Sequence, residues 1–294
     1  MIDPRGLRVF LAVCRAGSIT GGARLLNLSQ PSVSNAIAQL ERATGVLLFE
    51  RSRSGISLTA AGAALQTRAE AMENLLADAE AQLRLADARI SGPLRVGGTP
   101  GALVSLLPAS VTKLEARIGP FDLRVVERSD AELGEMLRRG EIELAFMTTG
   151  LEAPPEDMEE RTASQDPFAL IVGPANHELP DEISLKEVAD MPWVLPEARG
   201  AFRRQVDALF MAAEVALPLG AIRCDSLLST KAIVRGSRRV TVLPVQVASA
   251  ELSIGVLRAI GIREAGFQRS VGIRKLRATR LSVAAQALLD VIFP

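Results

Sequence analysis

A segment that begins at Ser29, within LSQPSVSNAIAQLERATG, carries short polar side chains of the kind that bond to DNA base edges. Ser29 can cap a helix whose first turn tolerates a proline. At 100° per residue, the inward face holds Val33, Ala36, Ile37 and Leu40. The outward face holds Pro31, Ser34, Asn35, Ala38 and Arg42. Such a face suits insertion into a major groove, although an ordinary solvated face has the same composition.

Two arginines, Arg51 and Arg53, follow this helix in VLLFERSRSGISLT, where two short apolar runs flank a Ser/Arg/Gly turn. The pattern predicts a β-hairpin. Its arginines could contact backbone phosphates or the minor groove beside the helix. The chain has a formal charge of zero, but residues 1–62 carry a net charge of +4 and the remainder −4. This asymmetry favours a polyanion as the partner of the N-terminal end.

A second candidate site lies in RVGGTPGALVSLLP, where a strand pattern ends in two glycines and a helix begins after Thr99 and Pro100. The free N–H groups of the first helical turn and the Thr99 hydroxyl would point to one spot. That spot favours an anion. An ordinary strand-to-helix turn would have the same sequence, so this alternative stays open.

Catalytic chemistry has few candidate residues in this chain. His177 is the single histidine, tyrosine is absent, and the two cysteines, Cys14 and Cys224, lie far apart. A Ser-His-Asp site or a zinc site with several imidazoles therefore has little material. The glycines of GGTPG match neither a Walker motif nor a dinucleotide fingerprint. We expect no metal, no cofactor and no enzymatic activity. Catalysis by carboxylates or lysine alone is a remaining alternative, but no spacing of Asp, Glu or Lys residues in the sequence indicates it.

Three short helices and a hairpin must position the first candidate site. Leu7, Phe10, Leu11 and Cys14 fall on one stripe of a helix that ends near Gly17. Ser18 can cap a second helix, with Ile19, Gly22, Ala23 and Leu26 on its inner face. A break at Asn27-Leu28 precedes the Ser29 helix. The order predicts a helix-turn-helix followed by a hairpin wing.

A long helix is predicted from Thr59 to about Arg89. Its apolar residues alternate spacings of four and three, as in the seam of a coiled coil, at Met72, Leu76, Ala79, Leu83, Ala86 and Ile90. Such a seam needs a partner helix, and a second copy of the chain is the simplest one. Packing of the helix on its own domain is the alternative.

After Ser91-Gly92-Pro93 the pattern changes to strand-like runs alternating with helical stretches. The runs are LRVGG, LRVVE, IELAFM, FALIVG, WVLP, RVTVLP and SVGIRKL, with helices near 101–117, 130–139, 200–214, 227–236 and 281–292. This alternation predicts a mostly parallel α/β sheet, and about 200 residues favour two lobes. No apolar run approaches the roughly 20 residues that cross a bilayer, and no signal-peptide pattern begins the chain. We therefore expect a cytoplasmic protein without a membrane partner.

The span from Leu7 to Gly62, with GSITGGARLLNLSQPSVSNAIAQLE, LLFER and LTAAG, resembles the winged helix-turn-helix domain of LysR-type transcriptional regulators. The resemblance is looser after residue 92. It implies a DNA-binding domain at 1–62, a dimerisation helix at 63–91 and a two-lobed α/β effector domain at 92–294, shaped like type 2 periplasmic binding proteins. Lobe I would hold about 92–160 and 268–294, and lobe II about 161–267. The family also implies a dimer, usually assembled into a tetramer.

The resemblance implies two sets of contact residues. In the DNA-binding domain, Gln30, Pro31, Ser34, Asn35 and Gln39 would meet bases or adjacent phosphates, and Ser32, Arg51 and Arg53 would anchor the DNA backbone. The matching effector positions are Thr99, Pro100, Arg128, Ser129, Met147, Thr148, Arg199, Gly200, Phe202 and Ser226. The effector is expected to be a small organic anion.

Two departures from the usual family pattern matter. Asn35 stands where many members carry a longer basic or amide side chain, so it should carry this protein's own DNA preference. Gly21 and Gly22 replace the usual alanines, at a cost of up to about 1 kcal/mol of helix propensity each.

Two alternative functions remain open. One is a small-molecule binding protein without DNA function, which leaves residues 1–62 unexplained, and the other is an α/β enzyme with a helical appendage.

Overall fold

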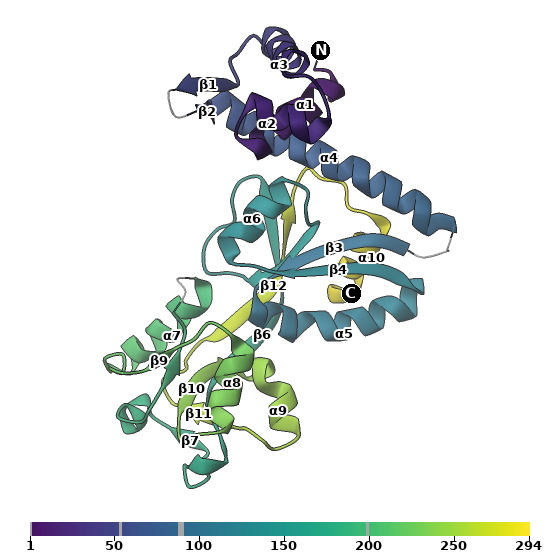
Figure 1. Cartoon of the computed structure of the whole chain (residues 1–294). Coiled ribbons are helices and arrows are strands. Elements are labelled where there is room, and N and C mark those ends of the chain that lie inside the picture. Colours follow the sequence, from purple (N-terminus) through teal and green to yellow (C-terminus); the bar gives the residue numbers. More distant parts are fainter. Residues whose placement is uncertain (1, 53–54, 88–90, 198–199) are drawn as a thin grey trace. The chain divides into compact units, whose positions relative to one another are not determined.

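The computed structural model describes residues 2–52, 55–87, 91–197 and 200–294 (Figure 1). The chain divides into two compact units. The N-terminal unit comprises residues 1–88 together with 135–142, and the C-terminal unit comprises 89–134 and 143–294. Among the described residues, no single helix is long and apolar enough to cross a membrane; the bent pair 4–16 and 19–26 passes by length and composition only.

The N-terminal unit has the predicted helix-turn-helix and wing. Its elements are α1 (Pro4–Ala16), α2 (Ile19–Leu26), α3 (Gln30–Thr44), β1 (Phe49–Ser52), β2 (Gly55–Leu58) and α4 (Ala60–Asp87). The side chains of Ser18 and Ser29 cap α2 and α3 by accepting backbone N–H bonds, as the sequence predicts. The turn between α2 and α3 is sharp because Asn27 takes a left-handed conformation with φ of 54°.

One apolar core holds the three helices and the wing together. Phe10 and Val13 are fully buried on α1 and Val33 on α3, and the Phe10 ring lies 5.2 Å from that of Phe49 in the wing. Gly22 explains one departure from the family pattern: a Cβ there would lie 2.8 Å from Val13 Cγ2 and 3.0 Å from the Val13 backbone. The close approach of α2 to α1 therefore depends on a glycine at this position.

Helix α4 has 28 residues, so it is about 42 Å long. Its first part belongs to the core of the N-terminal unit, where Ala69 is fully buried and Met72 packs against the apolar cluster. Further along, Leu76 and Leu83 are 57% and 73% exposed. The first residue of the predicted seam, Met72, therefore packs inside the N-terminal unit, and the later leucines are exposed. Ile90, the last residue of the seam, lies outside the described residues.

Residues 135–142 join the N-terminal unit by packing against α4. The Arg139 Nε lies 3.1 Å from Glu70 Oε2, and the Asn74 side-chain amide donates to the Arg139 carbonyl oxygen at 2.8 Å. Gly140 takes a left-handed conformation with φ of 63°, and a Cβ there would lie 3.7 Å from the Ala71 Cα. Residues 135–138 of this segment are the last turn of a helix whose first residues belong to the C-terminal unit.

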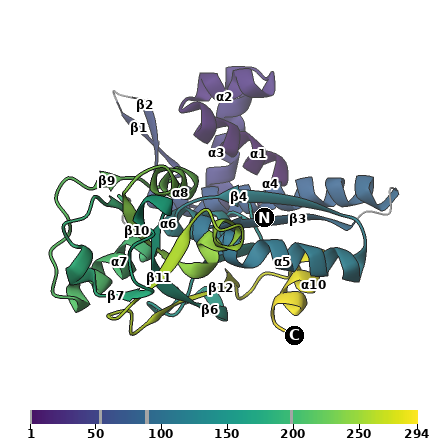
Figure 2. The ribbon, with the colours of Figure 1, turned by 90° about the horizontal axis from the view of Figure 1, so that it is seen from below.

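Lobe I of the C-terminal unit is an α/β layer built from both ends of that unit. Its elements are β3 (Ser91–Gly98), α5 (Pro100–Ile118), β4 (Phe121–Glu127), α6 (Asp130–Arg138), β5 (Leu144–Thr148), the first part of β6 (Met158–Val172), β12 (Gln268–Leu276) and α10 (Val283–Ile292). The strand order is β4-β3-β5-β12-β6. Helices α5 and α10 pack against each other and against β3 (Figure 2).

Lobe II is built from a continuous stretch of chain. Its elements are the second part of β6, η1 (Pro174–Asn176), β7 (Glu182–Ile183), η2 (Leu185–Val188), β8 (Val194–Leu195), α7 (Ala201–Ala212), β9 (Ile222–Arg223), α8 (Leu227–Arg235), β10 (Val240–Pro244), η3 (Val245–Ala248), α9 (Ser249–Ser253) and β11 (Arg258–Ile262). Trp193 and Phe210 pack edge to face at 5.1 Å in its core. Strands β10 and β11 flank β6.

The expectation of a mostly parallel sheet is wrong, because β6 runs through both lobes antiparallel to its neighbours and β12 runs antiparallel to both of its neighbours in lobe I. Strand β6 has 15 residues and pairs antiparallel with β12, β10 and β11, and β12 pairs antiparallel with β5. Only β3 with β4 and β5, β7 with β11, and β8 with β9 are parallel pairs among the described strands. Strand β11 and the first half of β6 are not predicted from the sequence. The residues MEERTASQ in β6 are mostly polar and lack the apolar alternation that indicates a strand.

Candidate functional site

Helix α3 presents a polar face to solvent. Val33, Ile37 and Leu40 are buried on one side, and on the other side Gln30, Pro31, Ser32, Asn35 and Gln39 are exposed, while Ser34 is half-buried. The Ser29 hydroxyl accepts the Ser32 N–H at 3.3 Å and lies 2.8 Å from the Ser32 hydroxyl oxygen. The predicted contact face therefore exists as a surface, and its first turn is ordered by the cap.

The wing is tied to α3 by one carboxylate. Glu41 Oε1 accepts the N–H groups of Leu48 at 2.8 Å and Phe49 at 3.4 Å, and thereby fixes the start of β1 beside the end of α3. Strands β1 and β2 pair antiparallel, and Arg51 lies opposite Ile56 in this ladder. The Arg51 backbone is part of β1, whereas Arg53 lies outside the described residues.

The C-terminal unit contains a cavity of about 690 Å³ that both lobes line. Seven of the predicted effector positions line it: Thr99, Pro100, Arg128, Ser129, Thr148, Gly200 and Phe202. Pro100 is the first residue of α5, and Thr99 precedes it with a hydroxyl that makes no cap bond. The Thr99 N–H bonds to the Phe146 carbonyl oxygen at 2.9 Å, which fixes the turn after β3.

Two predicted positions within the described residues, Met147 and Ser226, are not on the cavity wall. Met147 is 2% exposed and precedes Thr148 on β5, so the alternation of a strand turns its side chain to the opposite face. The Ser226 hydroxyl caps α8 by accepting the Ser229 N–H, and the cavity is lined by its neighbours instead. Arg199 lies outside the described residues.

The deepest part of the wall includes residues that the sequence did not single out. Thr230 on α8, Thr241 on β10 and Arg269 on β12 line the cavity and are 5%, 2% and 3% exposed. A threonine within the apolar run RVTVLP and an arginine within QRSVGI were the available signals. Neither signal is sufficient by itself, because the sequence does not reveal which side of a strand faces a cavity.

Arg269 forms a buried ion pair with Asp166 on β6. Arg269 Nη2 lies 3.4 Å from Asp166 Oδ2 and donates to the Ser105 hydroxyl at 2.8 Å and the Gly101 carbonyl at 3.2 Å. Burial lowers the Arg269 pKa to about 10, although the Asp166 carboxylate opposes this shift. Burial likewise raises the Asp166 pKa, against the Gln246 N–H bond and the charge of Arg269. Desolvation therefore outweighs the attraction within the pair.

Two polar contacts join the lobes beside the cavity. Asp130, the first residue of α6 in lobe I, accepts the N–H of Ala201, the first residue of α7 in lobe II, at 3.3 Å. Arg204 on α7 lies 3.3 Å from Glu152 in the loop after β5. Both side chains of the second pair are more than half exposed, so its contribution is below about 1 kcal/mol. These two contacts are thus weak enough for a ligand to replace, whereas strand β6 and the buried pair of Arg269 with Asp166 also connect the lobes.

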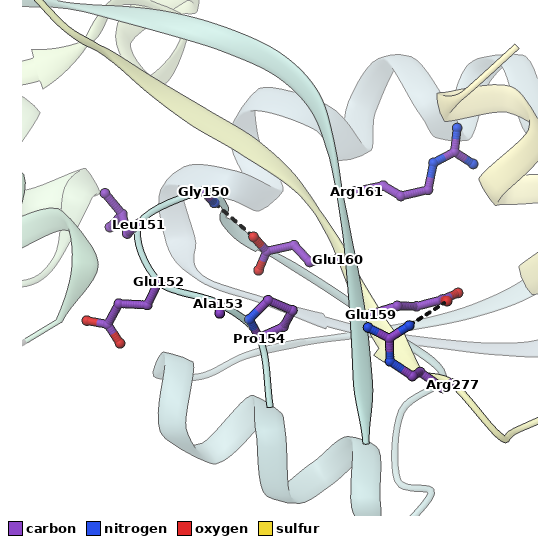
Figure 3. A pocket seen from close by; sticks show the side chains of 9 residues that line it. All are labelled: Gly150, Leu151, Glu152, Ala153, Pro154, Glu159, Glu160, Arg161 and Arg277. Carbon is purple, nitrogen blue, oxygen red and sulfur yellow. Dashed lines mark hydrogen bonds and ion pairs between the residues drawn. The ribbon is translucent and has the colours of Figure 1, made fainter. Parts of the chain in front are cut away.

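A second hollow, of about 620 Å³, lies on lobe I between the loop 150–154 and β6 (Figure 3). Its charged groups already have partners. Glu160 accepts the Gly150 N–H at 2.8 Å and binds Arg274 through its other oxygen, while Arg277 lies 3.9 Å from Glu159. Arg161 covers the Phe293 ring at 4.1 Å. These pairings fix the loop and make the hollow a poorer ligand site than the cavity between the lobes.

The groups considered for redox or catalytic chemistry are dispersed. Burial raises the pKa of the Cys14 thiol to about 11, so it is a poor nucleophile at neutral pH. Cys224 lines the cavity, and its thiol lies 3.6 Å from the Ser226 carbonyl oxygen. The His177 side chain is 86% exposed. Among the described residues, no group of three or more His, Cys, Asp or Glu side chains could hold a metal ion.

Two family models match the chain. Residues 4–63 match the model described as a bacterial regulatory helix-turn-helix protein of the lysR family, and residues 87–293 match the LysR substrate binding domain.

Individual proteins show the same similarity. The HTH-type transcriptional regulator YdcI of Escherichia coli, itself uncharacterised, is 26% identical over 98% of this chain and 94% of its own length. PcaQ of Agrobacterium fabrum is 27% identical over 98% and 93%. A full-length OxyR variant from Pseudomonas aeruginosa has the same fold, with a TM-score of 0.70, 22% identity and coverage of 99% and 95%. CbnR in complex with its target DNA gives a TM-score of 0.71, 20% identity and 99% coverage of both chains.

Proposed function

The chain belongs to the LysR family of bacterial transcriptional regulators, and from that premise we propose which of its residues meet DNA and which meet the effector. Members of the family are DNA-binding regulators, not enzymes, and they respond to an effector through the substrate-binding domain. The helix-turn-helix match accounts for residues 4–63, which a small-molecule binding protein without DNA function would leave unexplained.

The exposed polar face of α3 carries the DNA proposal. Gln30, Pro31, Ser34, Asn35 and Gln39 meet base edges or adjacent phosphates, because a buried stripe on the opposite side leaves this face free. Ser32, Arg51 and Arg53 anchor the DNA backbone on either side. Asn35 is fully on the exposed face and has an amide that can pair with adenine, so it determines sequence preference.

The DNA proposal is tested by gel shift and footprinting on the DNA that flanks this protein's own gene. Asn35→Ala should change the ranking of half-site variants by about 1–3 kcal/mol at one base pair. Gln286→Ala, on the exposed side of α10, is the matched control and should leave the ranking unchanged. A uniform loss of affinity at every site would make Asn35 a residue that only positions the helix.

The effector is a small organic anion bound between the two lobes. The N-terminus of the 19-residue α5, the free Thr99 hydroxyl and the guanidinium of Arg269 meet at one corner of the cavity. A Cβ on Gly101 would lie 2.4 Å from Arg269 Nη1, so the guanidinium sits directly against the first turn of α5. Helix N-termini and guanidinium groups both stabilise carboxylates. Arg128, Ser129, Thr148, Gly200 and Phe202 complete the wall, and Arg199 remains a candidate contact from the sequence.

Self-association through α4 completes the proposed regulator. The exposed apolar seam of α4 pairs two chains, and two such pairs form a tetramer.

The effector shifts the equilibrium between open and closed lobes. The size of this shift equals the difference between its binding free energies for the two conformations. The protein acts in the cytoplasm, where its DNA target is.

A further inference from the structure

The wall of the inter-lobe cavity contains several largely buried polar side chains. Thr148, Thr230, Thr241 and Arg269 line the cavity and are each more than nine-tenths buried. Among the described residues, Arg269 Nε is a buried donor without an acceptor, and the hydroxyls of the three threonines, for which no protein partner is found, face the open cavity. These four groups are a built polar surface inside the protein.

The four groups come from different parts of the fold. Thr148 on β5 stands opposite Val271 on β12, and Arg269 is two residues before Val271, so both side chains emerge on the same face of the lobe I sheet. Thr230 and Thr241 come from α8 and β10 of lobe II. A ligand that contacts all four therefore bridges the two lobes.

A ligand that fills the cavity displaces water from these hydroxyls. An apolar ligand would leave each hydroxyl unsatisfied, at a cost of about 1–3 kcal/mol, so a ligand with matching oxygen atoms gains affinity that an apolar ligand cannot. A hydroxyl both donates and accepts, and its natural complement is another hydroxyl or a carboxylate oxygen; a guanidinium only donates. The wall therefore favours a ligand with several oxygen atoms, at least one of which is anionic.

The rest of the wall limits the size and kind of the ligand. The volume of about 690 Å³ suits a small molecule. Phe202 is the only aromatic side chain among the described residues that line the cavity, so a stacking surface for an aromatic ring has one member at most.

We propose that the effector is a small aliphatic hydroxy acid. Its carboxylate binds at the corner formed by Arg269 and the N-terminus of α5, and its hydroxyl groups bond to Thr148, Thr230 and Thr241. This inference rests on the proposed function, since it names the chemical class of the anion bound at that site.

The test measures binding of matched acids to the full-length protein by isothermal titration calorimetry and thermal shift. The pairs are malate with succinate, tartrate with succinate, and gluconate with hexanoate, and benzoate represents aromatic acids. At least one hydroxy acid should bind ten-fold or more tightly than its partner without the hydroxyl, because sites built to bond a hydroxyl reject analogues that lack it.

Isosteric variants assign the preference to the proposed groups. Thr230→Val and Thr241→Val should each weaken binding of the hydroxy acid about ten-fold and leave binding of its partner acid unchanged. Thr112→Val is the matched control, because its hydroxyl bonds to the Pro108 carbonyl on the exposed side of α5, and it should change neither. The thermal midpoint of each variant without ligand shows that it is folded, and Thr148→Val is the replacement if one is not.

The outcomes separate this inference from the function it rests on. Binding of succinate, hexanoate or benzoate with no preference for a hydroxylated acid overturns the inference and leaves the organic-anion proposal standing. A hydroxyl preference that survives both valine substitutions overturns the assigned contacts. Binding of no acid at all overturns the inference and the anion proposal together, while DNA binding is measured separately.

Discussion

Leu76 and Leu83 on α4 expose 57% and 73% of their surfaces in a single chain, and these fractions set the strength of the proposed pairing. Full burial of a leucine side chain contributes about 1.5–3 kcal/mol, so each exposed fraction represents about 1–2 kcal/mol. A symmetric pair of helices contains two copies of each leucine, and all four side chains become buried. The four side chains together contribute about 4–8 kcal/mol to association.

Replacing both leucines by glutamate removes this contribution and places like charges opposite each other across the pair. A loss of about 4 kcal/mol or more raises the dissociation constant by roughly 10³ or more. The mass of the Leu76→Glu, Leu83→Glu variant in solution should therefore be half that of the wild type, whether the wild type is a dimer or a tetramer. Multi-angle light scattering over a range of protein concentrations measures this mass.

The matched control is Met211→Glu on α7, because Met211 is 78% exposed and belongs to the other unit. It should leave the mass unchanged, and both variants should keep the wild-type far-UV circular dichroism. A double variant with the wild-type mass at every concentration would show that α4 is not the pairing element, and the seam would then be only a surface of one chain.

Three further outcomes are expected. Arg51→Ala with Arg53→Ala should weaken binding to specific and random duplex alike and reduce the slope of log affinity against log salt by about 0.9 per lost phosphate contact; an unchanged slope would remove the wing from the interface. At pH 8, iodoacetamide should modify Cys14 about 200-fold more slowly than a free thiol, because a pKa of about 11 leaves about a thousandth of it as thiolate; peptide mass spectrometry measures the rate, and ordinary reactivity would show that the thiol is not desolvated. Gly22→Ala should lower thermal stability by about 1–2 kcal/mol through overpacking, whereas Gly6→Ala, whose Cβ would have no contact under 3.8 Å, should not.

The local structure of the N-terminal unit follows from its sequence. The caps at Ser18 and Ser29 and the stripe of Val33, Ile37 and Leu40 each depend only on residues close in the chain, and the structure confirms them. Which side of a helix is free follows from the same period. The exposed face of α3 can therefore be predicted from the sequence alone.

The cavity wall was less predictable because it depends on pairing between distant segments. The residues at strand-to-helix turns, such as Thr99 and Ser129, could be found because polar residues after strands mark the edge of a sheet. Thr241 and Arg269 lie within strands, where the register with β6 decides which way a side chain points. For the same reason Met147 was expected on the cavity wall, although its side chain points to the opposite face of β5. The polar first half of β6 could not be predicted as a strand either, because its pairing with β12 involves a distant segment.

The unequal origin of the two lobes has a consequence for the order in which the chain acquires its structure during synthesis. The apolar clusters of lobe II draw their buried residues from Phe168–Ile262 alone. The cluster of lobe I joins Leu94 to Leu289, which lie on either side of lobe II in the chain. All core residues of lobe II therefore leave the ribosome before α10 does, whereas lobe I must keep an exposed sheet face until α10 has emerged. The nascent chain thus completes the second lobe before the first.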